Sequence, residues 1–318
     1  MKPRHDIYAT VTDQLIAAIE AGAGDWKMPW HHSGTPVMRP TSVAGRRYSG
    51  INRLVLWATA DALGYASGTW ATYQQWKAHD GQVRKGENGT HVILWKKVER
   101  SEGNASVMPG DRDGDGRARF FARSFVVFNR DQVDGVDIDM IKDVQPVTTA
   151  ISDALAFLES VGIPVEYGLH DAYYRPDIDK VFMPERPAFD SDLDLVSTLA
   201  HEIGHGTGHP SRLARDTLRE YHKDRATRGR EELAAELTSA MVMADLGLAC
   251  TPRPDHAAYL SSWLATLRHD PKAIFTAAAQ AQAAADWIHA AAAKAVSASS
   301  QTDVALVDET APDLALAA

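Results

Sequence analysis

Two histidines four residues apart, with a glutamate directly after the first, stand in the segment His201-Glu202-Ile203-Gly204-His205. Positions four apart on an α-helix differ by about 40° around its axis, so both imidazoles can reach one metal ion. Glu202 lies beside the first histidine, where its carboxylate can accept a proton from an attacking water. The spacing predicts a site for one Zn²⁺ ion, with His201 and His205 as ligands and Glu202 as the catalytic base of a hydrolase.

A buried helix must carry this pair. Apolar residues recur before and within the motif at Leu195, Val196, Leu199 and Ile203, which predicts a helix over 192–206. Three glycines at 204, 206 and 208 crowd its end and leave backbone room near the second histidine.

A catalytic zinc site needs a third protein ligand and one open position. We favour Glu232, which follows His205 by 27 residues, with Glu236 one turn further along the same helix face. This spacing resembles the Glu-zincins, in which the first acid binds zinc and the second hydrogen-bonds a ligand histidine. Glu236 as the ligand is the close alternative.

Two other ligand patterns fit less well. His209 stands four residues after His205, but the glycines and Pro210 predict that the helix ends there and turns His209 away. The metzincin pattern would place a histidine at 211, where the chain has Ser211. A hydrogen-bond donor to a developing oxyanion has four candidates, between which the sequence does not choose: Tyr173, Tyr174, Tyr221 and His222.

The first 130 residues have a different character. They carry 18 Lys/Arg against 12 Asp/Glu, whereas residues 131–318 carry 15 against 30, for a net charge of −9. Six tryptophans stand among the basic residues, at positions 26, 30, 57, 70, 76 and 95. Aromatic rings stack on unpaired bases and cations follow phosphates, so this composition is typical of proteins that bind single strands. A tryptophan inside an apolar helix, such as Trp57, is better explained as a core residue.

Composition and length exclude several classes. The 318 residues are 45% hydrophobic and 24% charged, with no apolar run near the ~20 residues of a membrane helix and no secretion signal, so we expect a cytoplasmic protein without a membrane partner. Cys250 is the single cysteine, which excludes an internal disulfide and a cysteine zinc cluster. Asp111 to Gly116 matches the start of a calcium loop, but Ala122 replaces the required glutamate, so we favour a mobile loop.

The periodicity predicts an α+β first half and a mainly helical second half with a small β-hairpin. In the first half we expect a helix with apolar positions from Ile7 to Ile19 that Gly22 and Gly24 stop, further helices over 51–63 and 70–79, and strands within 83–98 and 119–129. In the second half we expect helices over 149–161, 192–206, 231–246, 256–267 and 271–292 and a hairpin within 165–183. Acidic residues 131–145 are predicted to link a domain of residues 1–135 to a domain of residues 146–295, before a disordered tail over 296–318.

Several segments together resemble one family. Residues 45–52 (GRRYSGIN), 70–75 (WATYQQ), 83–90 (VRKGENGT) and 127–133 (VFNRDQV) look like the N-terminal domain of ArdC-type antirestriction proteins. Residues 201–213 (HEIGHGTGHPSRL) and 231–237 (EELAAEL) look like the metallopeptidase domain of that family. The N-terminal domain is shared with TraC-type plasmid primases, which we expect to lack the second domain.

The resemblance implies a domain that binds single-stranded DNA, fused to a zincin-like metallopeptidase domain that cleaves an unknown protein or peptide. Such proteins shield entering conjugative plasmid DNA from host restriction. The candidate DNA contacts that it implies are Arg46, Tyr48, Asn52, Trp70, Arg84 and Lys85. The alternative is a DNA-binding shield whose zinc site is structural, or whose peptidase cleaves a regulator unrelated to restriction.

Overall fold

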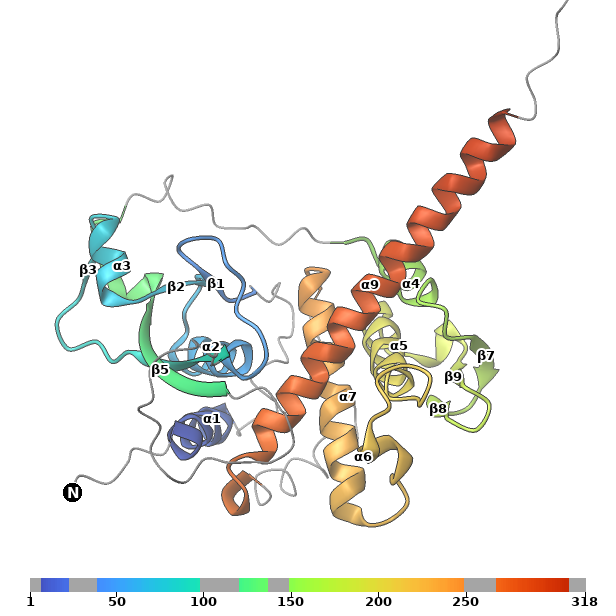
Figure 1. Ribbon diagram of the computed structural model, residues 1–318, viewed down its shortest axis with the longest axis horizontal. Coiled ribbons are helices and arrows are strands. Elements are labelled where there is room, and N and C mark those ends of the chain that lie inside the picture. The colour runs from blue at the N-terminus through green and yellow to red at the C-terminus, as the bar shows by residue number, and fades with distance from the viewer. Residues whose placement is uncertain (1–6, 23–38, 98–119, 137–148, 249–266, 309–318) are drawn as a thin grey trace, which may run out of the picture.

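The computed structural model describes residues 7–22, 39–97, 120–136, 149–248 and 267–308, in two halves that lie side by side (Figure 1). The predicted helix over 256–267, the calcium-like loop, Trp26, Trp30 and Cys250 lie outside these residues, apart from the last residue of that helix. No helix in the described part of the chain has the length and apolar character needed to cross a membrane.

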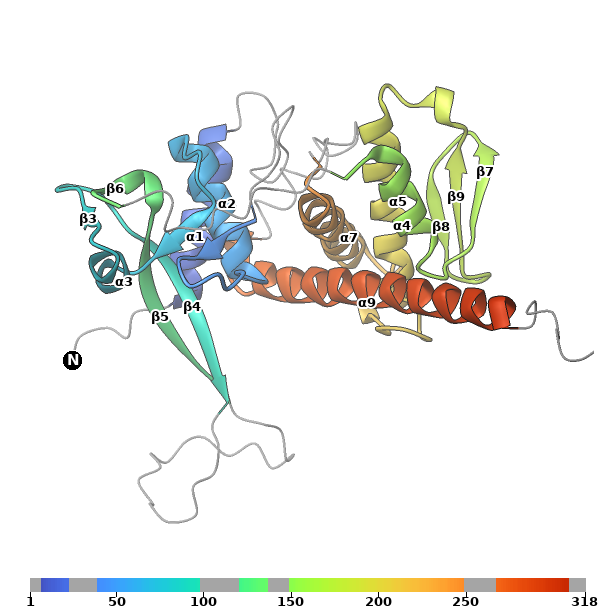
Figure 2. The same ribbon diagram turned by 90° about the horizontal axis from the view of Figure 1, so that it is seen from above.

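The N-terminal half is α+β, as predicted. Its helices are α1 (Ile7–Gly22), α2 (Ile51–Leu63) and α3 (Tyr73–Ala78). One sheet has the strand order β1-β2-β5-β4, and a smaller sheet pairs β3 with β6. Their bounds are β1 Thr41–Ser42, β2 Thr69–Ala71, β3 Gln82–Val83, β4 Thr90–Lys97, β5 Phe120–Asn129 and β6 Val133–Asp134. The long antiparallel pair β4–β5 projects from this half (Figure 2).

Two predictions for this half need correction, namely the start of the third helix and the extent of the linker. Trp70 lies in strand β2 opposite Asn129, and the helix begins only after Thr72, whose side chain forms a capping box with Gln75. The strands expected within 83–98 are present, since β4 lies within this range and β3 ends at its first residue; β3 pairs with β6 and β4 pairs with β5. The acidic segment from Asp131 is not all linker, because its first residues form a 3-10 turn (Arg130–Gln132) and β6.

The C-terminal half places helices beside a small sheet. Helix α5 (Asp192–Gly206) matches its predicted bounds, and α7 (Arg225–Asp245) begins six residues earlier than predicted. The predicted hairpin is present as β8 (Tyr173–Arg175) and β9 (Lys180–Pro184), and β7 (Val165–Leu169) adds a third strand parallel to β9. This half also contains α4 (Ile151–Glu159), a 3-10 turn (Arg186–Ala188) and α6 (Asp216–Arg219).

Helix α9 (Ala273–Asp308) corrects the predicted tail, because it continues well past residue 296. Buried small residues along its first turns, such as Ala278, Ala281 and Ala285, let it approach α7 closely. It also contacts α2, α4 and α5, so it spans both halves (Figure 2).

One hydrophobic core crosses the boundary between the halves. The same cluster of buried residues includes Leu54 and Trp57 of α2 and Met241 and Ile288 of the C-terminal half. Arg53 of α2 is fully buried at this boundary and pairs with Asp245 at the end of α7, at 2.9 Å. The two predicted domains are therefore packed as one body.

Candidate metal centre

Helix α5 positions the histidine pair. The helix begins after Ser191, whose side chain accepts a hydrogen bond from the backbone of Asp194, and acidic residues in its first turn interact favourably with the positive end of the helix dipole. His201 and His205 lie on one face, and both are buried, as is Glu202 between them in the sequence.

Helix α7 supplies the carboxylates. It is capped by Asp224, which accepts a hydrogen bond from the backbone of Thr227 at 2.6 Å. It packs directly on α5 at Gly204, where an added Cβ would lie 3.3 Å from Cα and O of Ala235. This glycine therefore brings the backbones close enough for glutamates of α7 to face the histidines of α5.

Three donor atoms converge between the two helices. Nε2 of His201 lies 3.1 Å from Nε2 of His205, and Oε2 of Glu232 lies 3.5 Å and 3.7 Å from these two atoms. The edge of a tetrahedron around zinc is about 3.3 Å for ligand bonds of about 2.0–2.1 Å. The group His201, His205 and Glu232 therefore fits one ion in size and in chemistry.

The outer nitrogen of each histidine faces a further glutamate. Nδ1 of His201 lies 3.3 Å from Oε2 of Glu236, and Nδ1 of His205 lies 3.1 Å from Oε1 of Glu231. A carboxylate at Nδ1 holds the proton there and leaves Nε2 as the ligand atom. Glu236 thus lies where a supporting residue would lie, whereas Glu232 lies where a ligand would lie.

The buried charges of this centre influence one another. Burial alone would lower the pKa of His205, but the carboxylates of Glu232 and Glu231 outweigh it and raise that pKa to about 10. Burial alone would raise the pKa of Glu231, but His205 and Arg215 lower it to about 2. The pKa of Glu232 is likewise lowered, against its burial, by both histidines. The ion-free centre therefore holds a proton on His205 between ionised carboxylates.

An open cavity of about 580 Å³ reaches this centre. Glu202, His205 and Glu232 line it together with the four residues named above as oxyanion donors. Among these four, Tyr221 makes a hydrogen bond to Oε1 of Glu232, and Nε of Arg228 donates to the Tyr221 hydroxyl at 3.1 Å. The hydroxyl of Tyr174 instead donates to Asp179 at 2.7 Å. His209 also lines the cavity but does not belong to the convergent group.

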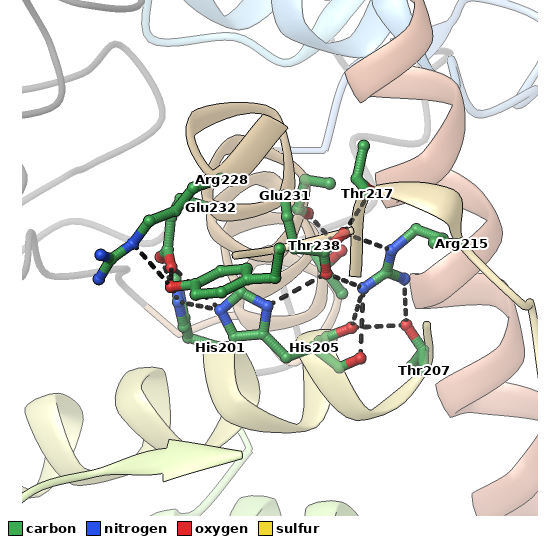
Figure 3. A network of polar contacts seen from close by, with 12 residues as sticks. His201, His205, Thr207, Arg215, Thr217, Arg228, Glu231, Glu232 and Thr238 are labelled. Carbon is green, nitrogen blue, oxygen red and sulfur yellow. Dashed lines mark hydrogen bonds and ion pairs between the residues drawn. The ribbon is translucent and has the colours of Figure 1, made fainter. Parts of the chain in front are cut away.

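Sequence reasoning missed the part played by Arg215 and Glu231. Arg215 is buried and donates to both carboxylate oxygens of Glu231, at 2.6 Å and 3.1 Å (Figure 3). The one signal in the sequence is the position of Glu231 directly before Glu232. A pairing with an arginine 16 residues away depends on the loop after α5, which no local pattern predicts.

Two of the candidate DNA contacts are engaged inside the N-terminal half. Trp70 is fully buried among Leu56, Val92 and Val127, so its predicted role in DNA contact does not fit this structure. The side chain of Asn52 makes two 2.7 Å hydrogen bonds with the backbone of Ile93 and holds β4 on α2.

The other four candidates are closer to the surface. Arg46 and Lys85 are exposed; Lys85 lies in a turn, and Arg46 directly follows one. Tyr48 packs its ring against the Trp70 cluster, and burial raises its pKa to about 12. Arg84 is exposed but pairs with Glu87 at 2.8 Å and also donates to the backbone of Asp131. Arg46 and Lys85 are thus the better placed of the six to meet phosphates.

Comparison with known proteins accounts for both halves. Residues 5–128 match the model of the N-terminal domain of anti-restriction factor ArdC, and residues 152–280 match that of a zincin-like metallopeptidase. The Mn(II)-bound crystal structure of antirestriction ArdC protein from the R388 plasmid superimposes with a TM-score of 0.72 at 38% identity, over 91% of this chain and 98% of that one. The chain belongs to the ArdC antirestriction family. The metal-free structure of the same protein gives a TM-score of 0.71 at 37% identity.

Two further relatives are similar to this chain over both of its halves. The uncharacterized protein y4eC of Sinorhizobium fredii is 48% identical over 90% of this chain and 92% of its own length. DNA primase TraC of Escherichia coli is 35% identical over 90% of this chain, which spans only 27% of the primase. The match to TraC includes the metallopeptidase half, so the expectation that such primases share only the first domain is wrong.

Proposed function

We propose that this protein protects incoming plasmid DNA from restriction by binding single strands through its N-terminal half, and that its C-terminal half is a zinc-dependent peptidase. The observation that carries the peptidase is the convergence of His201, His205 and Glu232 at an open cavity that Glu202, His205 and Glu232 line. The membership of the ArdC family supports the antirestriction role.

In this mechanism three residues hold the ion, and Glu202 carries the proton. A zinc ion, when bound, polarises a peptide carbonyl and makes water a better nucleophile at neutral pH. A carboxylate oxygen of Glu202 takes the proton from the attacking water and then delivers it to the nitrogen of the leaving amine. The Tyr221 hydroxyl lines the same cavity and donates to Glu232 in this structure; we assign it to the oxyanion as a donor that turns from Glu232 to the substrate.

Replacing the base tests whether peptidase chemistry serves antirestriction. Glu202→Gln keeps the size of the side chain but removes the proton acceptor, so we expect normal zinc content and folding with no peptide cleavage. The assay measures how much unmodified plasmid DNA is established in a restricting host, once in the presence of the unchanged protein and once in the presence of Glu202→Gln. If protection survives unchanged in the variant, the peptidase does not explain antirestriction, and DNA shielding alone does.

The DNA-binding proposal is supported by the excess of basic residues in the first 130 and by the exposed Lys85 and Arg46. Affinity for a single strand should fall as salt rises, because protein cations release counterions from the phosphates. Lys85→Glu should weaken binding of an unstructured oligonucleotide in a mobility assay. Lys294→Glu makes the same charge change at an exposed position of α9 and should leave binding nearly unchanged. No binding by the unchanged protein at low salt would exclude the proposal.

A further inference from the structure

A buried arginine joins the end of α5 to the carboxylate helix. Arg215 lies in the loop before α6, and its guanidinium donates to Oγ1 of Thr207 at 2.6 Å and to the carbonyl of Gly204 at 2.7 Å. Both acceptors lie at the C-terminal end of α5, where carbonyls lack partners within the helix. The same guanidinium holds both carboxylate oxygens of Glu231 on α7. Arg215 therefore fixes α5 and α7 relative to each other beside His205 (Figure 3).

Glu231, which Arg215 holds in place, contacts the proposed ligand His205. Its side chain is fully buried, and its Oε1 atom faces Nδ1 of His205 at 3.1 Å. The Thr217 hydroxyl donates to its other oxygen. With both oxygens held, the carboxylate keeps one orientation, and the His205 ring that faces it keeps Nε2 directed toward His201 and Glu232.

The third glycine of the motif is explained by the same arginine. A Cβ at residue 208 would lie 2.8 Å from Cζ and Nη2 of Arg215, closer than non-bonded atoms approach. Gly208 is thus the residue that lets the guanidinium reach the end of α5. This contact, rather than room for the ion, accounts for a glycine at this position.

We propose that Arg215 is a positioning residue of the metal centre, which orients the His205 ring for the ion by fixing the carboxylate of Glu231. The inference rests on the proposed metal site. It goes beyond that site because Arg215 is neither a proposed ligand nor a residue that lines the cavity, and yet it is assigned a specific effect on metal affinity.

The same loop offers a matched control. Arg212 has 10% of its side chain exposed, donates to the carbonyl of Gly206 at 2.7 Å, and pairs with Asp179. It resembles Arg215 in burial, in its contact with the end of α5 and in its ion pair, but its carboxylate partner lies on the β8–β9 turn and contacts no histidine of the convergent group. Glu231 is fully buried whereas 34% of the Asp179 side chain is exposed, so Arg215→Lys should lower stability more than Arg212→Lys. An effect on metal affinity should come from Arg215 alone.

The experiment measures the zinc affinity of the full chain by competition with a chromophoric chelator, for Arg215→Lys and Arg212→Lys. Lysine keeps the charge but lacks the planar fork that holds two carboxylate oxygens and two further acceptors together. We expect Arg215→Lys to bind zinc about 10- to 100-fold more weakly, the usual effect of losing support behind a ligand histidine. Arg212→Lys should bind zinc within about twofold of the unchanged protein, well below that range. The absorption spectrum of bound Co²⁺ should change only in Arg215→Lys.

Thermal unfolding of both variants separates positioning from general stability. Equal zinc affinities in the unchanged protein and Arg215→Lys would overturn the inference, as would parallel losses of affinity in the two variants. If Arg215→Lys does not fold, Thr217→Val removes only the hydroxyl bond to Glu231 and should still weaken zinc binding several-fold; unchanged affinity there would overturn the inference. An unchanged protein that binds no zinc would overturn the proposed function as well.

Discussion

Metal binding should release the proton that the carboxylates hold on His205. The pKa of this ring is raised to about 10, so at pH 7 the imidazolium outnumbers the neutral imidazole by about a thousand to one. An incoming ion must displace that proton at a cost of about 4 kcal/mol, equivalent to a thousandfold lower apparent affinity at pH 7 than at pH 10. Glu232, whose pKa is lowered, is already ionised and should release none.

The direction of the pH dependence, for zinc affinity and for stability, follows from the raised pKa of His205. Protons compete better at low pH, so the apparent zinc affinity should fall about tenfold for each unit below pH 10. In the ion-free protein, the raised pKa stabilises the fold fully below about 6.5, and this contribution is lost as the pH rises through about 10. The ion-free protein should therefore unfold at a lower temperature at pH 9 than at pH 7, while zinc should bind more tightly.

Isothermal titration of the ion-free chain with zinc provides the assay. Repeating the titration at pH 7.0 and 8.5, in buffers of different ionisation enthalpy, gives the number of protons released, and we expect about one from His205 at either pH. His209→Ala serves as the control, because His209 lines the same cavity outside the convergent group. An affinity that does not change with pH, together with no proton release, would refute the reasoning that places His205 as an imidazolium between carboxylates.

Three further predictions concern the packing around the site. Arg53→Leu should reduce the free energy of unfolding by about 3 kcal/mol, because it leaves the buried Asp245 with only part of its compensation, and an unchanged urea midpoint would contradict this. Burial would raise the pKa of Asp245, but His289, Arg53 and Arg39 lower it below its usual value of about 3.9. The stabilisation of the fold by this carboxylate is therefore present above about pH 3.9 and is lost as the pH falls through the lower pKa of the folded state. Asp245→Asn should make the free energy of unfolding less dependent on pH in acid. Gly204→Val should abolish zinc binding, measured as metal content after dialysis, because a branched side chain would push α5 away from Ala235 on α7; a variant that retains its zinc would show that the close approach is not needed.

The helix that carries the histidines could be predicted from the sequence almost without error. Apolar spacing fixed its face, and Ser191 and Gly206 stand at its two ends. The same is true of α2, which ends at Gly64 in a left-handed conformation that glycine adopts without strain. Local pattern was sufficient in both cases because each helix is defined by contacts within a few residues.

Pairings between distant segments could not be predicted in this way. Trp70 has the aromatic character of a binding residue, yet the sheet buries it, since β2 lies between β1 and β5. Strand β3 is separated from its partner β6 by about fifty residues, so nothing near the turn at 85–89 indicates that the two neighbouring strands belong to different sheets. The contact between Arg215 and Glu231 escaped prediction for the same reason.

The core that α2 shares with α7 and α9 has a consequence for inheritance. Either half taken alone would expose the apolar face that now covers the other, and Asp245 would lose the arginine that enters from α2. Exchange of one half between relatives would join faces that were not selected to fit, and Asp245 would keep from its own half the partner His289 alone among the three described cations that it pairs with. We therefore expect recombination to move both halves together, as a single gene segment, even where only one of the two proposed activities is under selection.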